Sequence, residues 1–264
     1  MSNERSVFTE LGRHFQMRPR ASQIRLAELT KETLVTGGVV CVEAPTGTGK
    51  TLGYLTGAIE AQRSGDEPLP VVVATATVGL QEQIIREDIP RLAKTGHLNP
   101  EKVAIAKGRS RYFCPRTAAI LEDKQMQDTQ FDMFATDKQV ADSGVPIALD
   151  MLKAWRTKSW DGDQDSWEGS LPGCWASTCA AKSSTCVGRV CEHYEQCPYM
   201  KSRRALAQAE LVIANQDIVL ADLAQRAEEH ASTALPFKRY ALIIDEAHKF
   251  PDKAAGACEA KADL

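Results

Sequence analysis

The sequence lacks a dominant charge. Its 264 residues carry 32 Lys and Arg against 35 Asp and Glu, which gives a formal charge of -3 at pH 7. This near balance excludes a strong overall basic field, so any nucleic-acid binding needs local basic patches. No apolar run approaches the ~18 residues of a membrane span, and the N-terminus, MSNERSVFTELGRHFQMRPR, lacks the apolar stretch of a signal peptide. The sequence therefore predicts a cytoplasmic protein with no membrane partner.

The cysteines are unevenly distributed. Disulfides rarely persist in the reducing cytoplasm, so the eight cysteines are expected to be thiols or metal ligands. Cys41 and Cys258 are isolated, and we interpret them as ordinary thiols. The other six belong to one central segment: Cys114, Cys174, Cys179, Cys186, Cys191 and Cys197.

Short apolar, β-branched runs alternate with helical patterns, which indicates an α/β fold with a parallel sheet covered by helices. Helical periodicity marks residues 23–34, 50–61 and 78–92. Buried strands are expected at residues 37–45, 69–77, 102–108, 210–215 and 239–247.

This alternation breaks in the middle of the chain, where all four tryptophans gather with an acidic loop, DGDQD. We therefore expect an α/β domain made of residues 1–108 and 200–264, interrupted by a mostly helical insertion at residues 109–199. The tryptophans could stack on single-stranded bases, although filling the insertion's small core is the more ordinary role. The loop lacks the glycine and the glutamate that a calcium loop requires.

The stretch EAPTGTGKT has the composition of a phosphate-binding loop between a strand and a helix. Glycines allow the backbone N–H groups to turn toward phosphate oxygens, and the start of the helix adds its positive dipole end. Lys50 is expected to reach the β and γ phosphates, and the Thr51 hydroxyl to ligate Mg²⁺. The remaining residues of the nucleotide cradle are Thr46, Gly47, Thr48 and Gly49.

The stretch LIIDEAH supplies the partner of this loop, because ligands of a parallel α/β sheet bind at the carboxyl ends of its strands. Asp245 is expected to hold Mg²⁺ through water. Glu246 would orient and deprotonate the attacking water. His248 would couple ATP hydrolysis to movements elsewhere in the protein.

The spacing of the central cysteines is compatible with several sites. Four thiolates make a [4Fe-4S] site, and Cys197-Pro198 matches the Cys-Pro that ends ferredoxin-type runs. A structural zinc site, with His193 as a further ligand, is the main competitor, and unligated thiols are the third possibility.

Together these motifs resemble the superfamily 2 helicases with a DEAH box, and within them the iron-sulfur helicases related to XPD, most closely the DinG type. The resemblance covers about residues 20–250. It rests on the phosphate loop, on KGRSRYFC, on the C-x4-C-x5-C run from Cys186 and on DEAH. It implies a RecA-like lobe interrupted by the cluster insertion, with ATP, Mg²⁺ and a [4Fe-4S] cluster as cofactors. The implied cluster ligands are Cys114, Cys186, Cys191 and Cys197.

The resemblance also implies contacts beyond the phosphate loop. Gln23, in RASQ, corresponds to the glutamine that reads adenine. The stretch ATATVGLQEQ is similar to motif Ia, whose Thr75, Thr77 and Gln83 would contact the nucleic-acid backbone, or else it is a strand end that caps the next helix. A local basic stripe, Lys107, Arg109, Arg111 and Arg116, is a further candidate for the path of single-stranded DNA, or else a solvated face.

The sequence departs from the family in three places. Ala44 replaces the first glycine of the phosphate loop, Gln216 follows Asn215 where the family usually has histidine, and Cys174 and Cys179 have no place in the ligand pattern.

The sequence stops soon after the DEAH box, so we expect it to represent the first motor lobe of a 5′ to 3′ DNA helicase, without the second lobe and its arginine finger. We expect a monomer that hydrolyses ATP slowly on its own. The alternative is a non-catalytic module that binds single-stranded DNA or a protein partner.

Overall fold

The computed structural model describes residues 6–45, 47–64, 68–131, 145–171, 173, 175–228 and 233–262. The chain divides into two compact units. The first combines residues 1–106 with residues 205–264, and the second comprises residues 107–204. No helix among the described residues is long and apolar enough to cross a membrane.

The first unit is built on a four-stranded parallel sheet with the order β2-β3-β1-β4. Each strand falls inside a predicted run, so the α/β fold and four of the five expected strands are confirmed. The central strands are the most apolar and the most buried, as expected for a sheet covered on both faces. The strands are β1 (Val71–Thr75), β2 (Val103–Ala106), β3 (Leu211–Asn215) and β4 (Ala241–Ile244).

The fifth expected strand, residues 37–45, is wrong for this structure. These residues form no strand, and Val39 is 99% exposed while Val40 and Val42 are about half exposed to solvent. A strand needs a neighbour whose N–H and C=O groups it can pair with. Among the described residues β4 pairs with β1 alone, and residues 37–45 do not pair with its outer edge.

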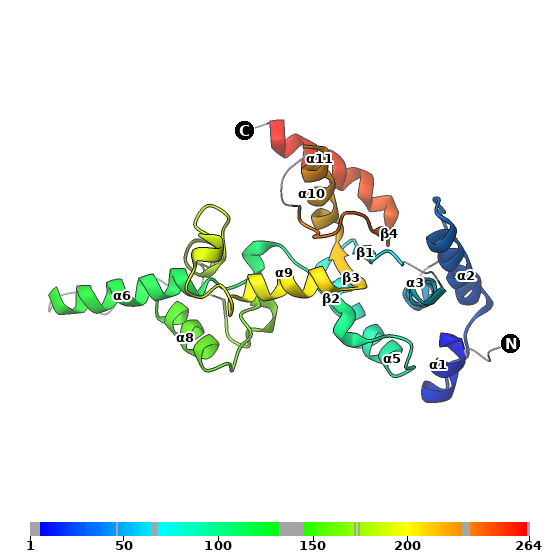
Figure 1. Ribbon diagram of the computed structural model, residues 1–264, viewed down its shortest axis with the longest axis horizontal. Helices are drawn as coiled ribbons and strands as arrows, with labels where there is room; N and C mark the ends of the chain where they lie inside the picture. Colours follow the sequence, from blue (N-terminus) through cyan, green and yellow to red (C-terminus); the bar gives the residue numbers. More distant parts are fainter. Residues whose placement is uncertain are drawn as a thin grey trace. The chain divides into compact units, whose positions relative to one another are not determined.

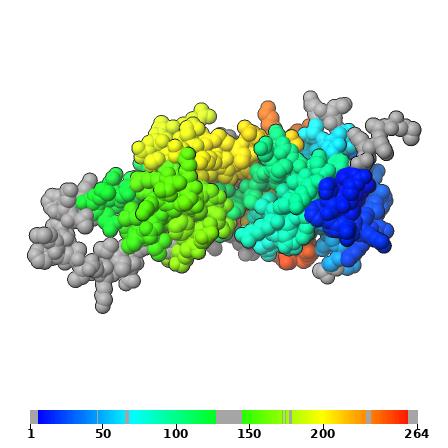
Figure 2. Space-filling view, turned by 90° about the horizontal axis from the view of Figure 1, so that it is seen from below, coloured from blue at the N-terminus to red at the C-terminus, as the bar shows by residue number. Residues whose placement is uncertain are grey.

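Helices cover both faces of the sheet (Figure 1). Alternate residues of β1 and β3 explain how, because successive strand side chains point to opposite faces. Val73 and Ile213 pack with α1 (Val7–Phe15), α3 (Lys50–Ser64) and α5 (Ile89–Ala93) on one face. Val72 and Val212 pack with α9 (Pro198–Gln208) and α10 (Gln216–Ala227) on the other. Figure 2 shows α1, in dark blue, on the surface of this unit.

Helices cover the three segments of the first unit that the periodicity predicts, residues 23–34, 50–61 and 78–92. Residues 78–93 are helical throughout, but a π-helical turn, η1 (Ile84–Asp88), interrupts them. The other helices are α1 (Val7–Phe15), α2 (Ala21–Thr36), α3 (Lys50–Ser64), α4 (Val78–Gln83), α5 (Ile89–Ala93), α10 (Gln216–Ala227) and α11 (Phe250–Ala262), with short 3-10 turns η2 (Pro100–Lys102) and η7 (Ala247–Lys249).

The second unit is helical around a small aromatic core. Trp155, Trp160 and Trp175 are buried, and Trp167 packs against them together with Phe113, which is fully buried. The tryptophans therefore take the ordinary core role. The elements are α6 (Pro115–Phe131), α8 (Val145–Arg156), the start of α9 (Pro198–Gln208), a π-helical turn η5 (Trp175–Cys179), and 3-10 turns η3 (Arg109–Arg111), η4 (Gln164–Ser166) and η6 (Gly188–Val190).

Burial of Asp88 in the first unit makes stability depend on pH. Burial raises the pKa of its carboxyl from 3.8 to about 6, against the lowering effect of Arg91. A raised folded-state pKa favours the folded chain below pH 4, and that contribution is lost as the pH rises through 6. We predict that Asp88→Asn increases the free energy of unfolding at pH 8 by about 1–2 kcal/mol and has little effect at pH 4. Urea denaturation at both pH values measures this, with the exposed Glu101→Gln as control. Equal effects of Asp88→Asn at the two pH values would contradict the prediction.

Candidate functional site

The phosphate loop has the backbone that its glycines permit. Gly47 and Gly49 have φ angles of +74° and +78°, which an L side chain rarely adopts. The Thr48 hydroxyl donates to the Pro45 carbonyl at 2.8 Å, and α3 begins at Lys50 immediately after the loop. The N–H groups of the first helical turn are therefore available to an anion. Thr51 lies in that turn, and Thr46 lies outside the described residues.

Two residues from the start of α2 hold this loop. The Gln23 amide donates to the Gly49 carbonyl at 3.3 Å, and the Arg20 guanidinium donates to the Gly47 carbonyl. A Cβ at Gly49 would collide with the Gln23 amide, so this glycine is required by close approach as well as by φ. Gln23 is thus beside the loop, in contact with its backbone.

The carboxylates of the DEAH box meet the phosphate loop at the end of β4. Lys50 Nζ donates to Glu246 Oε1 at 3.1 Å, and this hydrogen bond lowers the pKa of the Glu246 carboxyl. The Tyr54 hydroxyl, one turn along α3, donates to Asp245 Oδ2 at 3.2 Å. His248 Nδ1 lies 3.5 Å from Glu246 Oε2 on an exposed side chain. The structure therefore brings Lys50, Asp245, Glu246 and His248 together.

Tyr54 was not anticipated from the sequence. It is buried, and both burial and the Asp245 charge raise the pKa of its hydroxyl well above 10, so it stays a proton donor to that carboxylate. Its place one turn after the loop lysine was the only available signal.

The backbone at Glu246 is strained, and hydrogen bonds from Gln216 hold it in place. Its φ of 52° is left-handed, which costs a residue with a side chain about 1–2 kcal/mol. Gln216, fully buried at the start of α10, donates its amide to the Asp245 carbonyl at 2.8 Å and reaches the Glu246 carbonyl at 3.5 Å. Gln216 thus fixes the peptide group between Asp245 and Glu246, and so the direction of the Glu246 side chain. The preceding Asn215 caps α10 by accepting a hydrogen bond from Ile218 N.

The motif Ia residues have different roles from those expected. Thr75 is fully buried and donates to the Thr77 and Ala214 carbonyls, so the prediction that it contacts nucleic acid is wrong for this structure. Thr77 caps α4 by accepting from Leu80 N, and Gln83 is exposed. Gln81, for which the sequence predicts no role, is buried and donates to the Ala106 and Ile213 carbonyls at the ends of β2 and β3.

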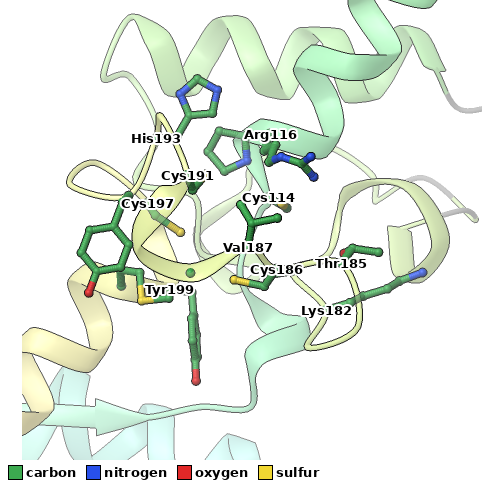
Figure 3. Close-up of a pocket in the computed structure, with 15 residues that line it drawn as sticks. Cys114, Arg116, Lys182, Thr185, Cys186, Val187, Cys191, His193, Cys197 and Tyr199 are labelled. Carbon is green, nitrogen blue, oxygen red and sulfur yellow. The ribbon is translucent and has the colours of Figure 1, made fainter.

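Four cysteines of the second unit line one pocket: Cys114, Cys186, Cys191 and Cys197. Figure 3 shows the sulfur atoms of Cys186 and Cys197 facing each other across it. Burial raises the pKa of the Cys197 thiol, and the nearby thiols of Cys114 and Cys186 raise it further. Cys179 is buried in the tryptophan core instead, and Cys174 lies outside the described residues.

The pocket fits a thiophilic metal group by its donor set. Its lining contains four thiols and His193 but no carboxylate, the combination expected for iron-sulfur or zinc and unsuited to Ca²⁺ or Mg²⁺. In the part of the chain that is described, no three His, Cys, Asp or Glu side chains are close enough to form a closed metal site. The four thiols therefore line the same pocket, but they are farther apart than the ligands of a closed metal site.

The basic stripe divides into two pairs. Lys107 Nζ lies 2.5 Å from Asp163 Oδ2 and 2.8 Å from Asp165 Oδ2, and Arg111 is paired with Asp165. Arg109 instead stacks on Tyr199, with its guanidinium carbon 4.1 Å from the ring centroid, and Arg116 lines the cysteine pocket. The charges of Lys107 and Arg111 are therefore neutralised by Asp163 and Asp165, whereas Arg109 and Arg116 do not pair with these two carboxylates.

Two family models match parts of this chain. The DEAD/DEAH box helicase family model matches residues 25–111, and the DEAD_2 model matches residues 182–262. ATP-dependent DNA helicase DinG of Escherichia coli K12 is 34% identical over 253 residues, and that of Salmonella typhimurium LT2 is 33% identical over 259 residues. Both alignments cover 93% of this chain. The chain is therefore similar to one part of the DinG helicases.

This relationship concerns one part of the DinG proteins. The chain spans 34% of the length of the Escherichia coli and Salmonella relatives, and 31% of that of DinG from Photobacterium profundum, with which it is 33% identical. The α/β lobe with a parallel sheet, predicted from the resemblance to this family, is consistent with the helicase family models.

Substitution of Gln216 tests whether its hydrogen bond to the Asp245 carbonyl stabilises the DEAH backbone. We predict that Gln216→Leu lowers the free energy of unfolding by about 1–3 kcal/mol, because the buried Asp245 carbonyl loses its donor. Urea denaturation measures the change, and the exposed Gln83→Leu on α4 is the control, with an expected change below about 0.5 kcal/mol. Equal small effects of the two substitutions would show that Gln216 does not support the DEAH backbone.

Proposed function

We propose that the chain is the first motor lobe of an ATP-dependent DNA helicase that moves 5′ to 3′ along single-stranded DNA. The observation that carries this proposal is the 3.1 Å contact between Lys50 and Glu246, which joins the phosphate loop to the DEAH box. The names of the relatives, which are ATP-dependent DNA helicases, supply the coupling to DNA. We expect it to work in the cytoplasm.

In the proposed reaction each residue has one task. Lys50 leaves Glu246 and pairs with the β and γ phosphates, which the loop N–H groups of Gly47, Thr48 and Gly49 also bind, with Thr46 completing the cradle. Glu246 is then free to orient and deprotonate the attacking water, and His248 follows its movement. Bound Mg²⁺, held by Thr51 and through water by Asp245, would neutralise charge on the phosphates. Gln23, beside the loop, would bind adenine.

The cysteine pocket would hold a [4Fe-4S] cluster through Cys114, Cys186, Cys191 and Cys197. The four-thiol lining and the resemblance to iron-sulfur helicases support this assignment. A tetrahedral zinc with the same thiols, or with His193 in place of one, is the competing occupant. Arg109 and Arg116, which are not paired with the acidic loop, would contact the phosphates of single-stranded DNA.

A second function is favoured by the share of the relatives that the chain matches. Because that share is 34%, the second motor lobe that an ATPase of this kind closes against would come from outside the region compared. The chain alone could then bind nucleotide and single-stranded DNA without unwinding, as a non-catalytic module. Without an arginine finger, hydrolysis should be slower by about 10³- to 10⁵-fold.

ATP binding tests the nucleotide site directly. We predict that Lys50→Ala weakens binding of a fluorescent ATP analogue at least about tenfold, because a charge-assisted contact to phosphate contributes about 1.5–3 kcal/mol. Lys31→Ala is the matched control, since Lys31 also pairs with a glutamate, Glu60, on α3, and it should bind as the unmodified chain does. Equal binding by Lys50→Ala and the unmodified chain would contradict the site.

A strand-separation assay distinguishes the two functions. A duplex with a 5′ overhang, compared with one carrying a 3′ overhang, should be unwound by the helicase in an ATP-dependent manner that Lys50→Ala abolishes. Salt-sensitive binding to single-stranded DNA without ATP turnover would instead support the binding module.

Metal analysis tests the ligand set. We predict that Cys114→Ser reduces bound metal as fully as Cys191→Ser, because each supplies one of four thiolates, whereas the exposed Cys41→Ser leaves it unchanged. Iron, sulfide and zinc are measured after anaerobic purification. Zinc without sulfide would overturn the cluster, and metal retained by Cys114→Ser would remove Cys114 from the site.

A further inference from the structure

The acidic loop of residues 161–166 has no part in the proposed reaction, yet it makes several ion pairs and hydrogen bonds within the second unit. Asp163 and Asp165 accept from Lys107, whose side chain is only 9% exposed, and Asp165 also pairs with Arg111. The two carboxylates are therefore neutralised by residues just before Cys114. Such partly buried pairs are costly to break on one side, because the remaining charge loses its partner.

The same loop holds the backbone that leads to Cys114. Tyr112 and Asp163 form an antiparallel bridge, and Phe113 N donates to the Gly162 carbonyl at 2.8 Å. On the opposite side, Cys114 N donates to the Cys179 carbonyl at 2.7 Å. The residues that carry Cys114 thus lie between two segments, and the acidic loop is one of them.

The loop also reaches the last cysteine of the pocket. Gly162 has a φ of +87°. A Cβ added at Gly162 would overlap Pro198, the residue directly after Cys197, because the Pro198 Cβ would lie only 2.8 Å from it. Gly162 therefore lies against both the Cys114 segment and the start of α9. One residue thus contacts the neighbours of two cysteines that are far apart in the sequence.

The loop keeps its own shape through internal hydrogen bonds. Asp161 accepts from Asp163 N at 2.9 Å, and Asp163 accepts from Asp165 N at 3.0 Å. The Trp160 indole donates to the Asp163 carbonyl at 3.0 Å, which attaches the loop to the tryptophan core.

We propose that the acidic loop of residues 161–166 is a scaffold that keeps the segments carrying Cys114 and Cys197 beside the same pocket before any metal binds, with Lys107 and Arg111 serving this scaffold instead of nucleic acid. The proposal rests on the proposed metal-binding role of the cysteine pocket. It gives the loop's residues a positioning role, since none of them lines the pocket.

Cross-linking of the metal-free chain tests the scaffold without reference to the metal. A short bis-maleimide should join Cys114 to Cys197 in the unmodified chain, as mapped by peptide mass. Gly162→Ala should lose this product, whereas Gly108→Ala, where a Cβ meets nothing within 4 Å, should keep it. An undiminished cross-link in folded Gly162→Ala would overturn the proposal.

Substitution of Lys107 tests the charge network and remains informative if Gly162→Ala fails to fold. In Lys107→Met the cross-link should be lost, and the half-time of metal loss to a chelator should shorten about tenfold, the low end of what removing an outer-sphere partner costs. Lys107→Arg should restore both values, which general destabilisation would not do.

Single-stranded DNA binding supplies the opposing outcome. If Lys107 were a phosphate contact, Lys107→Met would lower the salt dependence of DNA binding by about one counterion and leave cross-linking and metal retention intact. That result would overturn the scaffold proposal. Failure of the unmodified chain to bind any metal would instead count against the proposed cluster, while its cross-link would still support the scaffold.

Discussion

The ion pair between Lys50 and Glu246 is the contact on which the first unit's proposed chemistry depends. The two residues are 196 positions apart, and they meet because β4 pairs in parallel with β1 while α3 packs against the same sheet. The pair is half buried and hydrogen-bonded, so it holds both side chains in position while the phosphates are absent. Gln216 and Tyr54 support the neighbouring carboxylate and backbone from the protein side. The nucleotide site is therefore organised by buried donors that take no part in the reaction.

The second unit follows the same principle with different chemistry. Its four pocket cysteines come from segments that are far apart in the sequence. The fold of the unit must place these segments side by side before a metal can bind. The tryptophan core and the acidic loop provide the necessary order, since the loop contacts the segment before Cys114 and the proline after Cys197. A core of buried aromatic side chains is an effective support for a small unit because each ring buries a large apolar area.

The sequence predicts what depends on local pattern, and it misses what depends on distant neighbours. The phosphate loop, the DEAH strand and four β-strands follow from glycines, apolar runs and helical periodicity within short windows. Residues 37–45 have the same apolar pattern as β1, but a strand also requires a partner edge, which no pattern within those residues reveals. Thr75 and Lys107 were interpreted as nucleic-acid contacts because hydroxyl and ammonium groups suit phosphates. Their carbonyl and carboxylate partners lie far away in the sequence, so burial and pairing become visible only in the fold.

The central claim is that Lys50 and Glu246 form one nucleotide site in which the phosphates replace the glutamate as partner of the lysine. Equilibrium binding of ATP to Glu246→Gln measures this most directly, because the substitution keeps the shape of the side chain and removes the competing charge. An ion pair of this exposure contributes about 1 kcal/mol or less, so ATP should bind Glu246→Gln up to roughly fivefold more tightly than the unmodified chain. Unchanged or weaker binding would contradict the account.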